Sequence, residues 1–150
     1  MQPHRRSFLL ASIAALWLGL AGTLSAAEDA KPFAEQHIVL QISDRDPFKQ
    51  TLVLNVANNL LRYYGPDKVD IEIVAFGPGL RLLFADNSNR GRIESLVQNG
   101  VRFSACKNTI RNMTRKLGHA PALNPHAVKV SAGVVRIIEL IDKGYKLIKP

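Results

Sequence analysis

The apolar positions of this chain follow two alternating patterns. Runs of neighbouring apolar residues are typical of strands that are buried on both faces. They predict five strands, at residues 37–43, 69–76, 101–105, 128–131 and 145–149. Between these runs, apolar residues spaced three or four apart predict helices, at residues 47–64, 80–85, 90–98, 108–117 and 133–143. The alternation predicts an α/β fold, a three-layer sandwich around a mostly parallel five-stranded sheet.

The first long helix has clear start and stop signals. Asp46 can cap its first turn, and Pro47 suits the first helical position because its missing N–H would have no partner there. Gly65 and Pro66 are expected to end the helix. Its apolar face is predicted as a broad stripe, made of Phe48, Leu52, Val56 and Leu60 with Val53, Ala57 and Leu61 beside them.

The amino terminus has the pattern of a secretory signal peptide. A basic stretch, His4-Arg5-Arg6, precedes a nearly unbroken apolar run from Phe8 to Gly22. Small residues at Ser25 and Ala27 then offer a cleavage site. We therefore divide the chain into a signal peptide (1–27), a polar leader (28–36) and one domain (37–150), and expect a periplasmic or secreted protein. Export by either the Sec or the twin-arginine route is compatible with Arg5-Arg6. No cysteine lies near the cleavage point, which excludes a lipid anchor there.

The chain is basic, with 20 Lys and Arg against 12 Asp and Glu and a formal net charge of +8. Removal of Arg5 and Arg6 with the signal leaves +6. Such a charge favours anionic partners. In an exported protein, a small anion, an acidic protein or a lipid headgroup is a better candidate than nucleic acid. The simpler interpretation is that the excess charge only aids solubility.

The chain contains a single cysteine, Cys106, so it has no internal disulfide. In a parallel sheet the loops that leave the carboxyl ends of the strands meet at one edge, and ligands bind there. Four segments are expected at that edge: 43–44, 77–79, 106–108 and 131–133. Cys106 is therefore predicted to lie at the functional edge of the sheet.

The position of Cys106 favours a reactive thiolate. It directly precedes a predicted helix, whose unpaired N–H groups and positive dipole end lower the pKa of a thiol. Arg102, Lys107 and Arg111 are expected to add positive charge nearby. The alternative is a buried, inert cysteine that packs as a small apolar side chain. Position alone does not separate the two.

Other chemistry is weakly signalled. His37, His119 and His126 do not have metal-ligand spacing, so no metal site and no cofactor is predicted. A Cys–His pair would need the proline-containing loop at 118–126 to fold back. The segment Gly77-Pro78-Gly79 is most simply a sharp turn, and secondly a place where backbone can approach a ligand.

Three segments together resemble a known family. They are V-A-F-G-P-G-L at 74–80, G-V-R-F-S-A-C-K-N-T at 100–109 and V-S-A-G-V-V-R-I at 130–137. In this order they are similar to the DsrE/DsrF-like family of sulfur-relay proteins, over residues 37–150. The resemblance implies a small α/β fold with a mainly parallel five-stranded sheet, and association as homotrimers or hexamers. It also implies that the cysteine after the third strand, here Cys106, carries sulfur as a persulfide. The subgroup with A-C-x-N-T after the strand is largely of unassigned function.

These observations lead to one main hypothesis and two rivals. The main hypothesis is an exported carrier of sulfane sulfur that exchanges sulfur with donor and acceptor proteins or small sulfur anions. Asn108 and Thr109 would stabilise the anionic sulfur on Cys106, and Gly77 and Gly79 would shape the opposite wall. The first rival is a non-enzymatic module that binds a small anion or joins an assembly, with a buried structural cysteine. The second rival is a metal or redox sensor that uses the thiol.

Overall fold

The computed structural model describes residues 31–150 of the chain. The predicted cleavage site after Ala27 lies outside these residues. The elements in chain order are β1 (Gln36–Ile42), α1 (Pro47–Tyr64), β2 (Val69–Ala75), the 3-10 helix η1 (Gly77–Leu83), α2 (Arg90–Gln98), β3 (Arg102–Cys106), α3 (Lys107–Leu117), β4 (Ala127–Val130), α4 (Gly133–Asp142) and β5 (Lys146–Ile148).

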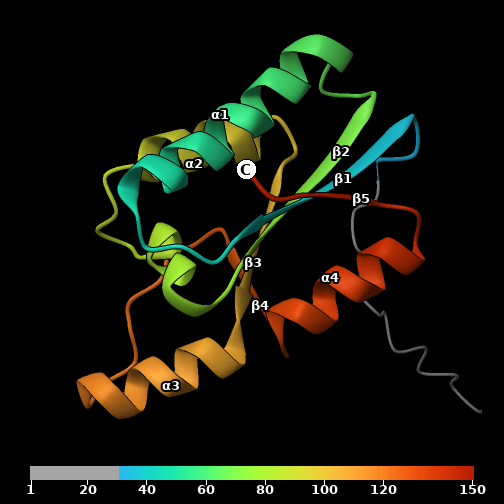
Figure 1. Cartoon of the computed structure of the whole chain (residues 1–150). Helices are drawn as coiled ribbons and strands as arrows, with labels where there is room; N and C mark the ends of the chain where they lie inside the picture. The colour runs from blue at the N-terminus through green and yellow to red at the C-terminus, as the bar shows by residue number, and fades with distance from the viewer. Residues whose placement is uncertain (1–30) are drawn as a thin grey trace, which may run out of the picture.

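The five strands form one sheet in the order β4-β3-β2-β1-β5. All four strand pairs are parallel, so the predicted α/β fold around a parallel sheet is confirmed. Helices α1 and α2 lie on one face of the sheet and α4 lies on the other, while α3 extends away from the carboxyl end of β3 (Figure 1). No helix within residues 31–150 combines the length and the apolar character needed to cross a bilayer.

The two faces of the sheet have different chemistry. Successive residues of a strand point to opposite faces, and β2 illustrates this in its centre. Ile71 and Ile73 belong to the large apolar core that α1 and α2 cover. Asp70 and Glu72 point to the other face and are fully buried there with exposed fractions of 0% and 1%. The apolar cluster on that face is small, consisting of Val39, Val74, Ile137, Leu140 and Tyr145 with Phe76 against it.

Helix α1 begins and ends as predicted, but its buried face differs from the prediction. The Asp46 carboxylate accepts a hydrogen bond from the Phe48 N–H at 2.9 Å, and Gly65 follows the last turn with a φ of +87°. Phe48 and Leu52 are exposed by 85% and 44%, so the prediction that they face the core is wrong. Val53, Ala57 and Leu61 are buried as predicted, and Gln50 and Leu54 are buried beside them.

Gln50 is a polar residue on the buried face of α1. Its side-chain amide donates to the carbonyl of Arg45, and its amide oxygen accepts from Asn87 at 3.0 Å. A buried polar side chain is tolerated when its hydrogen bonds are made. Hydrophobic periodicity leaves out Gln50, so it identifies only part of the buried face.

Candidate functional site

Cys106 lies at the junction between a strand and a helix, as predicted. It is the last residue of β3 and the N-cap residue of α3. Ser104 and Cys106 are two residues apart in β3, so both point to the face that α4 covers. Cys106 is buried, with 4% of its surface exposed. The thiol is therefore both at the predicted edge and largely shielded from solvent.

The groups around the sulfur favour its ionised form. Burial raises the pKa of the Cys106 thiol, but hydrogen bonds from the Thr109 hydroxyl and from the backbone N–H groups of Thr109, Gly133 and Asn108 outweigh it. The net result is a pKa below the ordinary value for cysteine. Hydrogen bonds to a charged group are stronger than those to a neutral group, which is why the thiolate benefits most.

Two helices direct their N-termini at the sulfur. Asn108 and Thr109 belong to the first turn of α3, and Gly133 is the first residue of α4. N–H groups in a first turn have no partner within the helix, and the helix dipole is positive at this end. The sequence predicts the contribution of α3, whereas that of α4 depends on how the chain folds.

Gly133 is required by the packing at this junction. A Cβ atom at this position would lie 2.8 Å from Cβ of Phe76 and 2.9 Å from its Cδ1. Any larger residue would push the start of α4 away from the sheet. The glycine thus allows the α4 N-terminus to approach Cys106.

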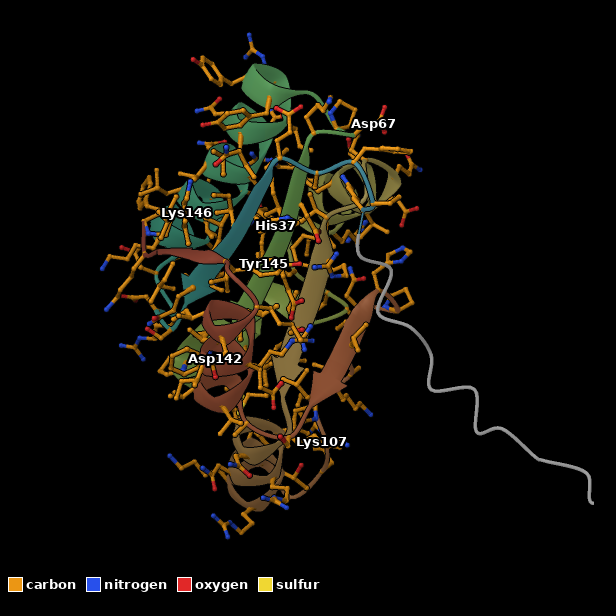
Figure 2. All side chains as sticks on the ribbon, turned by 90° about the vertical axis from the view of Figure 1, so that its right-hand side faces the viewer. His37, Asp67, Lys107, Asp142, Tyr145 and Lys146 are labelled. Carbon is orange, nitrogen blue, oxygen red and sulfur yellow. The ribbon has the colours of Figure 1, made fainter. Side chains whose placement is uncertain are left out.

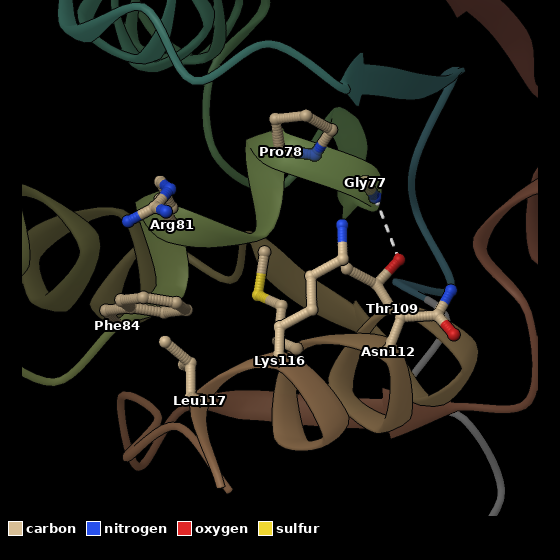
Figure 3. A pocket seen from close by; sticks show the side chains of 9 residues that line it. Gly77, Pro78, Arg81, Phe84, Thr109, Asn112, Lys116 and Leu117 are labelled. Carbon is tan, nitrogen blue, oxygen red and sulfur yellow. Dashed lines mark hydrogen bonds between the residues drawn. The ribbon is translucent and has the colours of Figure 1, made fainter. Parts of the chain in front are cut away.

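The Thr109 hydroxyl is oriented by the loop after β2. The Gly77 N–H donates to Thr109 Oγ1 at 2.8 Å (Figure 3). Because the oxygen accepts from Gly77, its own hydrogen remains available for the sulfur of Cys106. Gly77 has a φ of +53°, a backbone conformation that favours glycine. Gly77 therefore acts on Cys106 through Thr109.

The other two predicted site residues have different surroundings. Asn108 faces Cys106 only with its backbone N–H, while its side-chain oxygen accepts from Arg111. Gly79 lies beneath the site, where a Cβ would stand 2.4 Å from the carbonyl oxygen of Ile42. Gly79 thus allows η1 to pack closely on the end of β1.

The expected cluster of positive charge beside Cys106 is only partly present. Arg102 is at the opposite end of β3, about 13 Å away at the usual rise of a strand. Its Nη1 contacts Asp70 Oδ1 at 2.5 Å. The prediction that Arg102 adds charge at the thiol is therefore wrong, because Asp70 holds its guanidinium elsewhere. Lys107 and Arg111 are exposed on α3, a helix without any acidic residue.

A buried network of charged side chains occupies the α4 face, and sequence reasoning missed it. Glu72 accepts two hydrogen bonds from Arg136, each at 2.7 Å, and one from Ser104 Oγ at 2.6 Å. No buried side-chain nitrogen or oxygen within residues 31–150 lacks a hydrogen-bond partner. The available signal was the alternation of acidic and apolar residues in β2, because a buried strand carries carboxylates only where cations pair with them.

The network continues toward the amino-terminal ends of β2 and β3. The Tyr145 hydroxyl donates to Asp70 Oδ2 at 2.6 Å and accepts from Arg102 at 3.0 Å. Burial, together with the hydrogen bond to Asp70, raises the pKa of Tyr145 to about 12. The His37 ring lies against Tyr145 with 5.2 Å between ring centroids, and both are labelled in Figure 2.

Arg136 connects this network to the thiol site. It lies three residues after Gly133, within one turn of α4, and its ion pair with Glu72 fastens that turn to β2. The network thereby helps to hold the Gly133 N–H at Cys106. It acts on the sulfur through the position of a helix and does not touch it.

The remaining histidines are engaged away from the thiol. His126 Nε2 contacts the Glu94 carboxylate, and His119 lies against the carbonyl of Ala120. Neither is among the groups that hydrogen bond to Cys106. Within residues 31–150, no group of three or more His, Cys, Asp or Glu side chains is placed to hold a metal ion.

A pocket of about 290 Å³ lies beside the thiol site, between η1 and α3 (Figure 3). Its lining residues are Gly77, Pro78, Arg81, Phe84, Thr109, Asn112, Met113, Lys116 and Leu117. Thr109 thus contacts both the pocket and Cys106, which itself does not line the pocket. No motif in the sequence indicates this pocket, because its walls come from two segments that only the fold brings together.

Comparison with known proteins identifies a solved relative but no assigned activity. No protein-family model matches the chain, and no curated protein matches it either. The chain is similar to a solved structure described as protein of unknown function MTH1491 from Methanobacterium thermoautotrophicum. The two share 30% sequence identity and a TM-score of 0.70, and the match covers 77% of this chain and 100% of that one.

Proposed function

We propose that this chain, which belongs to the same family as MTH1491 of Methanobacterium thermoautotrophicum, is an exported carrier of sulfane sulfur. The description of that relative assigns no activity, so the proposal depends on the site itself. The observation that carries it is the position of Cys106 at the N-terminus of α3 and beside the start of α4, where the Thr109 hydroxyl and nearby backbone N–H groups lower the pKa of the thiol. The thiolate is the nucleophilic form of cysteine.

The same donors suit the product of sulfur transfer. The Cys106 thiolate attacks the outer sulfur of a donor, the donor's S–S bond breaks, and its electron pair leaves with the remaining part of the donor. Cys106 then holds a persulfide, an anion that the N-termini of α3 and α4 stabilise as they stabilise the thiolate. Attack of an acceptor thiolate on the terminal sulfur returns Cys106 to its thiolate. Transfer between molecules needs no second cysteine.

The test is the intact mass of the purified protein after incubation with thiosulfate or polysulfide. Wild-type protein is expected to gain the mass of one sulfur atom and to lose it on reduction. The Cys106→Ser variant is expected to gain none, because a serine oxygen cannot form a persulfide. A wild-type protein that never gains sulfur, or a variant that gains as much, contradicts the proposal. The rival binding module with an inert cysteine would then be preferred.

We also propose that the protein forms a homo-oligomer through the outer side of α4. Val134, Ile138 and Ile141 are spaced along one side of this helix and are exposed by 54%, 53% and 43%. Val128 on the edge strand β4 and Leu147 on β5 are exposed as well. A row of exposed apolar residues along one side of a helix is a candidate interaction surface. Light scattering should give a mass above that of a monomer for the wild type and a smaller mass for Ile138→Lys. Phe48→Lys on α1 is the matched control; a monomeric wild type contradicts the proposal.

A further inference from the structure

The pocket between η1 and α3 combines an apolar lining with two cations. Phe84, Met113 and Leu117 supply apolar surface, and Pro78 closes the side toward η1. Its volume of about 290 Å³ is near the lower end of the range for small-molecule sites, roughly 300–1,000 Å³. An apolar pocket with a few polar groups is the usual form of such a site.

The charged residues that line the pocket are all basic. Arg81 and Lys116 line it, and none of its lining residues is acidic. Neither cation has a salt bridge to a carboxylate among the residues that the structure describes. Arg81 instead lies over the Phe84 ring, with its guanidinium carbon 5.8 Å from the ring centroid. Two cations without a carboxylate partner beside an apolar surface match an anion that carries an apolar group.

The position of the pocket connects it to Cys106. Lys116 extends from α3 toward Pro78 of η1, and Thr109 lies beside it (Figure 3). Thr109 is also one of the residues beside Cys106 that lower the pKa of its thiol. A ligand held by Lys116 therefore has its charged end near the residue that stabilises the thiolate.

We propose that this pocket binds an organic thiosulfonate, an anion in which an apolar group R is attached to –SO₂–S⁻. The group R packs on Phe84, Met113 and Leu117, the oxygens of the sulfonyl group face Arg81 and Lys116, and the outer sulfur is directed at Thr109. The assignment as sulfur donor rests on the proposed carrier function, whereas the binding of the anion does not.

The transfer step is balanced without a further reactant. The Cys106 thiolate attacks the outer sulfur of R–SO₂–S⁻, a bond forms between the two sulfur atoms, and the original S–S bond breaks. Its electron pair leaves with the sulfinate R–SO₂⁻. Two negative charges enter the step, and two leave it as the sulfinate and the Cys106 persulfide.

Binding is tested with benzenesulfonate, which has the ring and the charge but no sulfur to transfer. By calorimetry, we expect it to bind both the wild type and Cys106→Ser at least tenfold more tightly than benzenesulfonamide, which lacks the charge, or sulfate, which lacks the ring. The double variant Arg81→Gln, Lys116→Gln should lose at least tenfold in affinity. The control, Lys107→Gln, Arg115→Gln, removes the same charge from outside the pocket and should change the affinity less than twofold. Equal affinities for the three probes, or an equal loss in the control, would overturn the pocket assignment.

The donor class is tested separately, by the rate at which Cys106 gains sulfur. Benzenethiosulfonate should load wild-type protein at least tenfold faster than thiosulfate at the same concentration, and the Arg81→Gln, Lys116→Gln variant should lose this advantage. Loading by thiosulfate that is as fast as loading by benzenethiosulfonate rejects the donor class and leaves the carrier function standing. If no donor loads Cys106 while benzenesulfonate still binds, the carrier function and the donor class fail together and the anion site remains.

Discussion

The two faces of the sheet bury different kinds of side chain. On the face under α1 and α2, burial is almost entirely apolar, and residues such as Ile71, Ile73 and Phe103 are excluded from water. On the face under α4, a single helix covers a small apolar cluster and a network of ion pairs around Asp70 and Glu72. Cys106 belongs to the second face. The comparison shows that the apolar face supplies the core of the domain, while the polar face holds the start of α4 at the thiol.

Substitutions on the two faces should also lower stability for different reasons. An apolar core loses stability roughly in proportion to the atoms that are removed from it. A buried ion pair depends on both partners, because removing one leaves the other charged and unpaired. Adjacent residues of β2 make this difference testable, since Glu72 and Ile73 are both buried and point to opposite faces.

The largest loss of stability is expected for Glu72→Ala. The substitution leaves Arg136 without its two hydrogen bonds and Ser104 without its acceptor, which should lower the free energy of unfolding by about 3–5 kcal/mol. Urea unfolding measures this. The control is Glu35→Gln, which breaks an exposed ion pair with Lys68 and should cost no more than about 1 kcal/mol.

A double variant separates the loss of charge pairing from the loss of packing. Glu72→Met with Arg136→Met removes both charges and fills similar volume, so it should recover most of the stability that Glu72→Ala loses. If the double variant is as unstable as Glu72→Ala, the ion pair has a role that apolar packing cannot replace, and the proposed difference between the faces is wrong.

On the apolar face, Ile73→Ala is expected to cost about 2–5 kcal/mol through lost burial and the cavity that remains. Unlike Glu72→Ala, it removes no partner of a buried charge, and filling the space should be sufficient to restore stability. Ile73→Val, which removes one methylene group, should therefore cost only about 0.5–1.5 kcal/mol. A loss for Ile73→Val as large as that for Ile73→Ala would contradict the cavity argument.

Thr109→Val tests the electrostatics of the polar face at the thiol. Loss of the hydroxyl removes one of the groups that favour the thiolate, which should raise the pKa of Cys106. The rate of alkylation by iodoacetamide as a function of pH measures this, and its midpoint should move to higher pH. Thr109→Ser keeps the hydroxyl and should keep the wild-type midpoint.

The same pKa has a consequence for stability. Because the pKa of Cys106 is lower in the folded protein than in the unfolded chain, ionisation of the thiol contributes stability that is complete above the unfolded pKa of about 8.5. This contribution is lost as the pH falls through the folded pKa. Thr109→Val should reduce it, so the stability of this variant should rise less between neutral and alkaline pH. A wild-type midpoint at or above that of a free cysteine would contradict the thiolate assignment.

The smallest effect on stability is expected for Cys106→Ser. The serine oxygen can accept the hydrogen bonds that Thr109, Gly133 and Asn108 direct at the sulfur, so the free energy of unfolding should change by less than about 1 kcal/mol. Its neighbour Ala105 points into the apolar core and is fully buried. Ala105→Ser should therefore cost more, about 1–3 kcal/mol, because its hydroxyl meets no such donors. Thermal unfolding of both variants checks the order, and a larger loss for Cys106→Ser would favour a purely structural cysteine.

Much of the fold could be predicted from local patterns. The runs of apolar residues and the end signals at Asp46 and Gly65 agree with the observed elements to within a few residues, and with one parallel sheet. The errors have a common cause. Residue type and spacing do not predict the surroundings of Gln50 and Arg102, because these depend on a hydrogen bond and an ion pair with residues far away in the chain.

The sequence by itself determined the order of strands and helices and the location of Cys106 between a strand and a helix. These features depend on periodicity, on caps and on the reversal of the chain at glycines, all of which act over a few residues. The tertiary structure decided what surrounds the sulfur. Gly133 reaches it because β4 pairs beside β3 and α4 returns over the sheet, and Gly77 orients Thr109 across 32 residues of sequence. Such contacts follow from the pairing register and packing of whole elements, which no short stretch of sequence encodes on its own.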